Sequence, residues 1–488
     1  MNILIDTNII IPLEDTNKLL DASFANMRRL ASEQHHCLCI HPMQYEDIKR
    51  DNDSHRRNIV LSRLNQYSQI ENPPILTEAE LRALNLIQGS ENDKVDNNVL
   101  FALYRGAVHL LVTNDLGIHK KAIKLGINEK VYRFDQFLTF LEKFNNKPIS
   151  SEYTGVIERH LYEIDKSQTF FDSLRQSYDG FDEWFQKCAE EKRKCWCIEG
   201  EQSRIVAICI YKHEQDTALT IDGRIIEGKI LKLCTFKVDP SARGKKLGER
   251  LLYIAFDYCK KNNYDWVYLH TFGEEQKSLV GLCIEYGFSL LGSYGQDDVY
   301  IKPMKLKDEI NSNTDSFIRF YPYFPNDKFV QKYIIPIQPA YHEDLFPDYS
   351  KMRGSLFEKE QSLYSSQGNT IKKAYLCHSK IKSIKRGDIV LFYRSNDRKS
   401  IQCMGIVEAA FFSSDINEVI PAIAKRTVYN FSDIENILRS RTLVILFRYI
   451  GLDKEIPRST LIKANIKGNI QSIRKISDEQ YSKIINEN

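Results

Sequence analysis

The sequence predicts a multidomain α/β protein, and three observations carry that prediction. At 488 residues, the chain has room for roughly three domains of about 150 residues each. Short apolar segments that suit strands alternate with helical patterns in the first part of the chain, which is typical of a parallel sheet. Polar stretches at residues 145–148 and 305–314 interrupt the pattern. We therefore expect domains over residues 1–148, 150–305 and 317–488.

The composition restricts the cell compartment and the partners. Lysine and arginine (68) nearly balance aspartate and glutamate (65), so any nucleic-acid surface must be local rather than global. Eleven cysteines without paired spacing, together with the absence of a secretory leader, favour a reducing cytoplasm. No run is long and apolar enough to cross a membrane, so no membrane partner is expected. The sequence does not predict the oligomeric state.

The first domain places acidic residues next to its expected strands and helices. Strands are expected at residues 3–5, 36–40 and 110–113, and a helix at 96–108. The acids are Asp6 after the first strand, Glu46 on a helix entered through Pro42, Asp96 at the start of the helix, and Asp115 after the third strand. Open α/β sheets place their sites at the carboxyl ends of strands. We therefore expect these acids to share one sheet edge.

Carboxylates gathered in this way suit a divalent metal. Aspartate and glutamate oxygens bind Mg²⁺ or Mn²⁺, which keep waters free for activation, and such ions serve phosphodiester hydrolysis. The alternative interpretation is that each acid caps a helix, as Asp96 would before an apolar run. Capping is the simpler explanation for any single acid, but it does not explain all four in this order.

The same residues carry a family resemblance. The motif at residues 3–8, the acid in residues 45–47, the helix of Asp96 and the triplet at residues 113–115 resemble a PIN domain over about the first 145 residues. PIN domains are metal-dependent nucleases, usually of RNA. The resemblance implies Asp6, Glu46, Asp96 and Asp115 as catalytic and metal-site residues. Asp93 is the alternative to Asp96 for the third position.

The second domain contains a basic, glycine-containing turn between a strand and a helix. Strands are expected at residues 195–198, 205–211, 230–238 and 266–270, and a helix at 249–261. The turn between them holds Arg243, Gly244, Lys245, Lys246, Leu247 and Gly248. Backbone amides at the start of a helix, with glycines that allow close approach, form an anion site. The sequence therefore predicts a phosphate-binding turn.

This arrangement resembles the GNAT family of acetyl-CoA-dependent N-acyltransferases over roughly residues 150–305. The resemblance implies that the backbone from Arg243 to Gly248 holds the pyrophosphate of acetyl-CoA, and that Phe236 and Val238 present backbone groups to its acetyl and pantetheine parts. Lys246 stands where the family often has glycine, and Cys283 where many members carry a tyrosine that protonates the leaving thiolate. Glu227 and Asp239 are nearby acids, and neither is identified as a general base.

The third domain combines basic and aromatic residues, and strands are expected in it at residues 317–320, 333–337, 389–394, 403–407 and 443–449. Between residues 371 and 399 there are nine lysines or arginines and two aspartates, with Tyr375, Phe392 and Tyr393 interleaved. Such a stretch suits a single-strand binder or, equally, a solvated basic face. Residues 384–394 and 404–408 resemble the core of PUA-like barrels of the ASCH and EVE group, which bind RNA or modified bases. That resemblance implies a nucleic-acid pocket near Tyr393, Arg394 and Ser395 in a small β barrel.

Together the resemblances imply an RNA-directed enzyme. It would combine a metal-dependent endonuclease, an acetyl-CoA-dependent N-acetyltransferase and a reader of RNA, with tRNA as one candidate, in a toxin or defence role. The first alternative is an N-acetyltransferase with a non-catalytic PIN platform. The second is a regulator that senses acetyl-CoA and binds nucleic acid.

Overall fold

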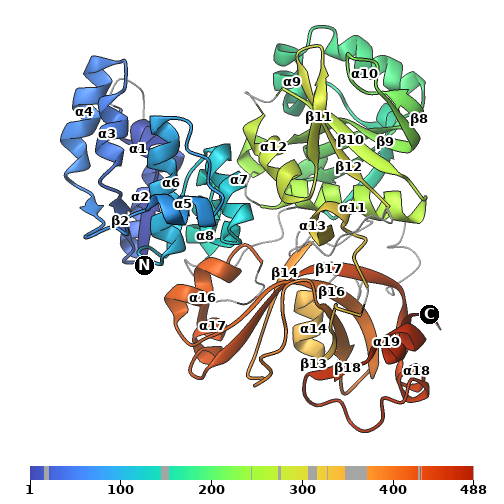
Figure 1. The fold of residues 1–488 in the computed structure, drawn as a ribbon. Coiled ribbons are helices and arrows are strands. Elements are labelled where there is room, and N and C mark those ends of the chain that lie inside the picture. Colours follow the sequence, from blue (N-terminus) through green and yellow to red (C-terminus); the bar gives the residue numbers. More distant parts are fainter. Residues whose placement is uncertain are drawn as a thin grey trace. The chain divides into compact units, whose positions relative to one another are not determined.

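The computed structural model describes the 488-residue chain except residues 16–20, 144–152, 243–244, 273–275, 306–315, 327, 347–370, 427–428, 430 and 487–488. The chain divides into two compact units (Figure 1). The first comprises Met1–Ile149, Ser413–Lys425 and Tyr429–Arg439, and the second comprises Ser150–Phe412, Arg426–Val428 and Ser440–Asn488. None of the described helices combines the length and apolar character that a membrane span needs.

The first unit contains a parallel sheet of five strands in the order β3-β2-β1-β4-β5. Its strands are β1 (Asn2–Ile5), β2 (Cys37–Ile40), β3 (Ser68–Gln69), β4 (Leu110–Val112) and β5 (Val131–Tyr132). The residues of β4 and the three isoleucine or leucine residues of β1 are fully buried, as expected for parallel strands covered on both faces. The parallel sheet expected for the first domain is therefore present.

Helices follow each strand of this sheet. They are α1 (Thr7–Glu14), α2 (Ala22–Glu33), α3 (Gln44–Lys49), α4 (Ser54–Leu64), α5 (Glu78–Ala83), α6 (Glu91–Tyr104), α7 (Leu116–Lys124), η1 (Asn128–Lys130) and α8 (Phe134–Lys143). The helix expected at residues 96–108 begins earlier, because Ser90 accepts the Asp93 N–H at 3.0 Å and caps it. Asp96 therefore lies inside α6 and is not a cap.

Two helices from late in the sequence complete the first unit. These are α16 (Ile416–Ile423) and α17 (Phe431–Ile437). The Tyr132 hydroxyl donates to the carbonyl of Pro421 at 2.8 Å, and Lys425 Nζ donates to the carbonyl of Asn128 at 3.0 Å. The Lys425 ammonium also lies 4.2 Å from the centre of the Tyr132 ring. Residues separated by almost 300 positions thus share one core, which no local sequence pattern indicates.

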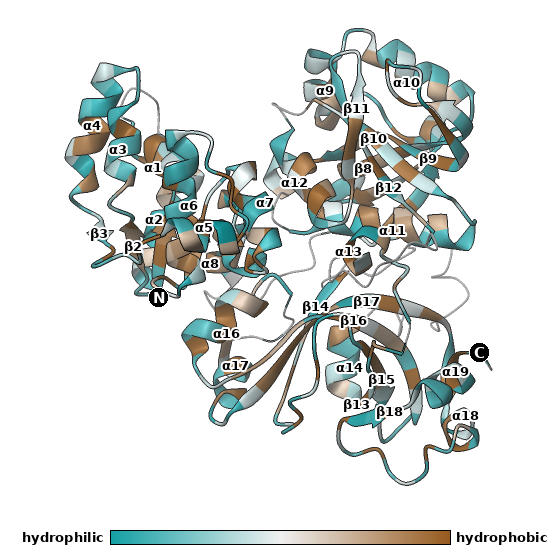
Figure 2. Ribbon diagram, in the orientation of Figure 1, coloured by the Kyte–Doolittle hydropathy of each residue, from teal (hydrophilic) through white to brown (hydrophobic). Residues whose placement is uncertain are grey.

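The second unit contains two sheets, and the first of them has seven strands. The order is β11-β12-β10-β9-β8-β7-β6, with hydrophobic residues along its central strands (Figure 2). Its strands are β6 (Ile157–His160), β7 (Lys194–Glu199), β8 (Ile205–Ala218), β9 (Ile225–Val238), β10 (Trp266–Thr271), β11 (Ser289–Tyr294) and β12 (Asp297–Pro303). The associated helices are η2 (Leu161–Glu163), η3 (Thr169–Phe171), α9 (Asp172–Ser177), α10 (Phe181–Glu190), η4 (Glu201–Ser203), η5 (Pro240–Ala242), α11 (Leu247–Lys261), α12 (Lys277–Glu285) and α13 (Ser316–Phe320). Residues 317–320, expected as a strand, are thus helical.

One strand pair in this sheet is parallel, and it separates partway along. The β9–β10 register runs from Ile230 opposite Trp266 to Leu233 opposite Leu269 and goes no further. On the other side of β9, the register with β8 shifts so that Cys234 is the extra residue. A bulge bends its strand and ends regular pairing. The ends of β9 and β10 therefore diverge, and their backbone groups point into an opening between the strands.

The third sheet has six strands in the order β14-β17-β16-β15-β13-β18. Its strands are β13 (Lys332–Ile337), β14 (Lys372–Cys377), β15 (Ile389–Arg394), β16 (Ser400–Ser413), β17 (Thr442–Pro457) and β18 (Arg474–Ile476), with helices α14 (Pro339–Leu345), α18 (Arg458–Lys463) and α19 (Asp478–Asn486). In the described part of the chain, β14 and β18 remain opposite edges, so this sheet is open and not the closed barrel expected from the sequence. Strand patterns locate β15 well but do not say which edge strands meet.

Candidate functional site

The predicted phosphate turn lies directly before α11 and ends in a strained residue. Arg243 and Gly244 fall outside the described residues. Lys246 adopts the left-handed conformation, with φ 62° and ψ 20°, which costs a residue with a Cβ roughly 1 kcal/mol or more. This conformation explains physically why glycine suits the position. The first N–H groups of α11, from Leu247 onward, have no partner within the helix and form an anion-binding end.

Gly248 brings the predicted cofactor residues together. A Cβ at this position would lie 3.0 Å from Leu282 Cδ2 of α12, 3.6 Å from Phe236 Cε1 and 3.8 Å from Val238 Cγ2. The absent side chain thus lets the start of α11 approach α12 and the diverging end of β9. Lys245 Nζ donates to the Tyr153 hydroxyl at 3.0 Å. The structure therefore gathers the described members of the predicted turn at the β9–β10 opening.

A cavity of about 320 Å³ opens on the same sheet. Its walls come from the segment around α10 and from four neighbouring strands, and its lining residues are Tyr178, Trp184, Arg193, Lys212, Glu214, Lys232, Cys234, His270 and Asp297. Both Cys234, at the bulge, and His270, near the end of β10, belong to the diverging strands. Gln276 links the end of β10 to the Tyr178 wall of the cavity, because it accepts from the Thr271 hydroxyl at 2.8 Å and donates to the Tyr178 hydroxyl at 3.3 Å. The cavity therefore borders the strand opening.

His270 is one of the titratable groups of this cavity that can accept a proton. Burial lowers the pKa of His270 to about 4, and the Lys232 cation adds to that effect while Glu214 opposes it. Among the described residues, its Nε2 has no hydrogen-bond partner. A neutral imidazole with a free ring nitrogen can accept a proton from an amine. Sequence reasoning missed His270, and its position near the carboxyl end of the strand paired with β9 was the only signal available.

Asp239, one of the two nearby acids considered from the sequence, is already paired in the structure. Asp239 forms an ion pair with Arg204 at 2.9 Å and accepts from Ser241. Glu214, which sequence reasoning did not identify, lines the cavity but accepts from the Tyr268 hydroxyl at 2.7 Å and pairs with Lys212 at 3.2 Å. Glu214 is thus held in place and influences His270 through its charge.

Neither Cys283 nor the nearby Tyr286 is placed to protonate the leaving thiolate. Cys283 is fully buried in α12, and burial raises the pKa of its thiol. Tyr286 is also buried, and burial followed by the charges of Glu249 and Glu285 raises the pKa of its hydroxyl. The guanidinium of Arg448 lies 5.2 Å from the centre of the Tyr286 ring. Tyr286 is therefore part of a packed contact and does not face the cavity.

The acids of the first unit meet in part at its sheet edge. Asp6 caps α1 and accepts from Thr113 Oγ1 and from Asn8 Nδ2, both at 2.6 Å. Burial, and then the charges of Asp115 and Asp47, raise the pKa of Asp6 to about 6. Burial and the charges of Asp6 and Asp115 raise the pKa of Asp96 to about 7. The charges of Asp115 and Asp47 thus lie close enough to Asp6 and Asp96 to hinder the ionisation of these two carboxyls.

Two other predicted acids point elsewhere. The Glu46 carboxylate is 62% exposed and pairs with Lys49 at 2.6 Å. Its neighbour Asp47 accepts instead from the Thr7 hydroxyl, beside Asp6, at 2.6 Å. Asp93 pairs with Lys121 at 3.0 Å and accepts from Ser90. The structure thus places Asp96, rather than Asp93, with Asp6.

The acid group does not form a ready set of metal ligands. Asp115 also caps α7 by accepting from the Ile118 N–H at 2.8 Å. In the part of the chain that the structure describes, no three histidine, cysteine, aspartate or glutamate side chains are arranged to hold a metal ion. As placed, the donor set does not fit Mg²⁺ or Mn²⁺.

The predicted nucleic-acid residues of the third sheet are engaged within their own domain. Tyr393 and Arg394 are buried. Arg394 pairs with Asp397 and with Glu343, the latter at 2.7 Å. Ser395 donates its hydroxyl hydrogen to the carbonyl of Ile337 at 3.1 Å. These side chains therefore support the end of β15 and present few free groups for a base.

Comparison with known proteins identifies one domain. Residues 159–288 match the Acetyltransferase (GNAT) family, so this part of the chain is a GNAT acetyltransferase domain. The match covers the seven-stranded sheet as far as Gly287 and Phe288. No curated protein matches the chain.

Similar solved structures cover about a third of the chain each. They include ASCH from Zymomonas mobilis, with 11% identity over 32% of this chain and 94% of that one at a TM-score of 0.24. Arabidopsis thaliana NAA60 in complex with a bisubstrate analogue shows 18% identity, and the match covers 30% of this chain and 95% of that one at a TM-score of 0.24. A GNAT acetyltransferase from Staphylococcus aureus shows 17% identity, and the match covers 31% of this chain and 99% of that one at a TM-score of 0.24. TM-scores this low do not establish a shared fold.

Proposed function

We propose that this protein transfers an acetyl group from acetyl-CoA to an amine bound in the cavity beside His270. The observation that carries the proposal is the opening between β9 and β10, because it places the anion-binding start of α11 and the His270 imidazole on one sheet within a GNAT domain. Acetyl-CoA, when bound, supplies the activated acetyl group as a thioester.

The chain's own residues have three tasks in this reaction. The N–H groups from Leu247 onward bind the pyrophosphate, and the free backbone edge of β9 near Phe236 and Val238 orients the acetyl arm. His270 accepts the proton that the attacking amine loses. The departing thiolate takes its proton from solvent, since Cys283 and Tyr286 are buried in packed contacts. The transfer thus depends more on positioning than on a paired acid and base.

The test is CoA release by the purified full chain. Acetyl-CoA is incubated with a panel of amines, including peptides with free N-termini, polyamines, aminoacyl-tRNA and total RNA, and the free thiol is measured with a thiol reagent. We expect release that depends on an amine and on His270. Binding of acetyl-CoA without transfer to any amine in the panel would favour the regulator that senses acetyl-CoA.

A second candidate function, a metal-dependent endonuclease acting on RNA, rests on the first unit. The observation that favours it is the raised pKa of Asp6 and of Asp96, each beside the Asp115 charge, at the edge of a parallel sheet. Glu46 and Asp93 would then be peripheral, and Asp47 would lie beside the group through Thr7. With the third sheet as a reader of RNA or tRNA, the joint function would be an RNA-directed cytoplasmic enzyme of a toxin or defence system.

Incubation with total RNA and Mn²⁺ or Mg²⁺ tests this second function. We expect discrete cuts that disappear in the double variant D6N/D96N, while binding of acetyl-CoA remains. The matched control is D51N, which removes an acid of the same unit that pairs with Arg56. If cutting persists in D6N/D96N, or no cutting occurs with either ion, the platform interpretation of the first unit holds.

A further inference from the structure

The residue after Gly248 connects the phosphate turn to the C-terminal sheet of the same unit. Glu249 lies in the first turn of α11 and is 5% exposed. Its Oε1 accepts the backbone N–H groups of Ile371 at 2.9 Å and of Lys372 at 3.0 Å, where β14 begins. Its other oxygen lies 3.4 Å from Lys246 Nζ. One carboxylate thus contacts both the strained residue of the turn and an edge strand of another sheet.

These contacts determine the charge state of Glu249. Burial alone would raise its pKa, but the Lys246 cation and the N–H groups of Lys372 and Ile371 outweigh that effect, so the pKa is lowered. Glu249 is therefore an anion one residue from Gly248. Without those three partners its charge would repel the pyrophosphate for which the start of α11 is suited.

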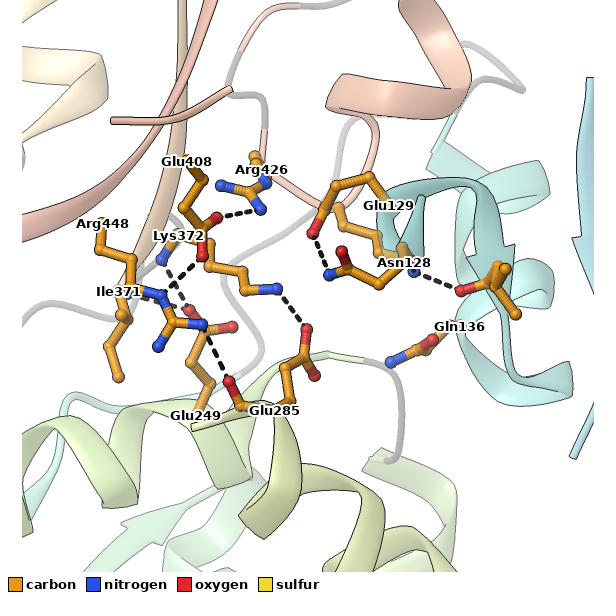
Figure 3. Close-up of polar contacts among 12 residues, drawn as sticks. Asn128, Glu129, Gln136, Glu249, Glu285, Ile371, Lys372, Glu408, Arg426 and Arg448 are labelled. Atoms are coloured by element: carbon orange, nitrogen blue, oxygen red, sulfur yellow. Dashed lines mark hydrogen bonds and ion pairs between the residues drawn. The ribbon is translucent and has the colours of Figure 1, made fainter. Parts of the chain in front are cut away.

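A second contact fixes α12, the helix that packs against Gly248. Lys372 is 2% exposed and pairs with Glu285 at the end of α12. Arg448 of β17 donates to the Glu285 carbonyl at 2.8 Å and to Glu408 Oε1 at 2.6 Å. Figure 3 shows Glu249 and Glu285 facing Lys372 and Arg448 across this contact. Both helices that border the turn are thus attached to β14 and β17.

We propose that the C-terminal sheet completes the acetyl-CoA site, with Glu249 as the positioning residue that transmits its support to the turn. The N–H groups of Ile371 and Lys372 hold Glu249, Glu249 holds the Lys246 ammonium, and that ion pair offsets the cost of the left-handed Lys246 backbone. This domain thus uses a lysine at a position suited to glycine because the neighbouring sheet stabilises the turn. Any partner that moves β14 would change the affinity for acetyl-CoA.

The inference rests on the proposed acetyl-CoA chemistry, and a double-mutant cycle on the full chain tests it. E249Q keeps an oxygen for the two N–H donors but loses the charge facing Lys246. K246G removes the strain and the ion pair together. Acetyl-CoA affinity is measured by calorimetry for the parent, E249Q, K246G and E249Q/K246G. The control D257N makes the same acid-to-amide change at the far end of α11, where Asp257 pairs with Lys261.

We expect E249Q to weaken acetyl-CoA binding about tenfold and K246G to change it by less than about threefold. The double variant should bind like K246G, because a glycine turn needs no ion pair to hold it. D257N should bind like the parent. This rescue separates positioning from general loss of structure, since a merely destabilised E249Q would not recover when Lys246 is also removed.

A variant on the β14 side provides an independent readout. K372M leaves the transferase domain unchanged in sequence and removes the pair with Glu285, so it should also weaken acetyl-CoA binding while the cavity residues stay in place. If E249Q and K372M bind acetyl-CoA as tightly as the parent, or if the effects of E249Q and K246G add, the proposal is wrong. If the parent itself does not bind acetyl-CoA, both the proposed function and this inference are wrong.

Discussion

Burial shifts pKa values in opposite directions at the transferase site and at the acidic edge of the first unit. In the transferase domain burial keeps His270 neutral, with a pKa of about 4, and leaves its Nε2 ready to accept a proton. At the acidic edge burial raises the pKa of Asp6 to about 6 and of Asp96 to about 7, so both favour the protonated form more than a free carboxyl does. The first arrangement is prepared for its proposed chemistry. The second requires a cation to become so.

The largest expected effect is the loss of acetyl-CoA binding at the transferase site. G248W should abolish acetyl-CoA binding, since even a Cβ there lies 3.0 Å from Leu282, and an indole would fill the approach of the pyrophosphate. G248A should cause a smaller loss, because the Leu282 side chain can shift slightly. Calorimetry gives the affinities. RNA cutting, if present in the parent, should persist in both variants, and tight acetyl-CoA binding by G248W would contradict the assignment of the turn.

A second variant sharpens the role of the neutral histidine. H270Q should lower kcat about 10²- to 10³-fold, as expected for loss of a proton acceptor, with acetyl-CoA affinity unchanged. H213Q is the matched control, since His213 lies on the neighbouring strand β8 but outside the cavity lining.

The pH profile provides a separate check on His270. Because its folded pKa is lowered to about 4, the imidazole stays unprotonated until the pH falls to that value. In the pH profile of kcat, the acidic limb that belongs to His270 should therefore lie near pH 4 instead of near the ordinary histidine pKa of about 6.5, while protonation of the free amine substrate affects kcat/KM separately. An acidic limb centred near 6.5 would show that another group accepts the proton.

The acidic edge makes the opposite prediction for stability. For Asp6 the folded pKa of about 6 exceeds the ordinary carboxyl value of 3.8, so the folded state binds more protons between these values. Its stability should fall as the pH rises from about 4 to 6, by about 3 kcal/mol for this one group. D6N should remove the fall, and hydrogen exchange of peptides from β1 and α6 would report it.

Divalent ions turn this stability test into a test of the metal site. If Asp6 and Asp96 rearrange to bind Mn²⁺, the ion should slow exchange in the parent at pH 8 and leave D6N/D96N unchanged. Equal exchange of the parent with and without Mn²⁺ would show that the donor set cannot rearrange, in agreement with its present geometry.

The smallest effect concerns Cys283. Restoring the family's tyrosine in C283Y should not raise kcat, because the thiol is fully buried and the larger ring has no space. Overpacking should instead destabilise the domain by about 1–3 kcal/mol, measurable by denaturant unfolding. A stable C283Y with a higher kcat would mean that the ring reaches the leaving thiolate.

Local sequence patterns predicted the parts of the molecule that depend on neighbours along the chain. The strand at Ile389–Arg394 matches its prediction. Phe236 and Val238 of β9 lie beside Gly248 of the turn, as predicted. Glycine chemistry and strand periodicity are local properties, so the sequence reveals them. The preference for Asp96 over Asp93 also agrees with the electrostatics of the fold.

The remaining features depend on contacts between distant segments. His270 becomes notable only when the bulge at Cys234 separates β9 from β10. Lys372 belongs to the basic stretch that suits a nucleic-acid binder, yet it is buried against Glu285. Arg394 likewise pairs with Asp397 and Glu343. A charge pattern cannot distinguish a lysine or arginine that meets solvent from one whose acid partner arrives from elsewhere in the chain.

The helices α16 and α17 have a consequence for how the protein is made. They belong to the first unit, yet about 270 residues of other structure are synthesised between α8 and α16. During translation the parallel sheet lacks the contacts that Pro421 and Lys425 make with Tyr132 and Asn128 until those later residues have been synthesised. The first unit is therefore the earliest to begin folding and among the last to finish. An activity that depends on the complete first unit would be absent until most of the chain has been synthesised.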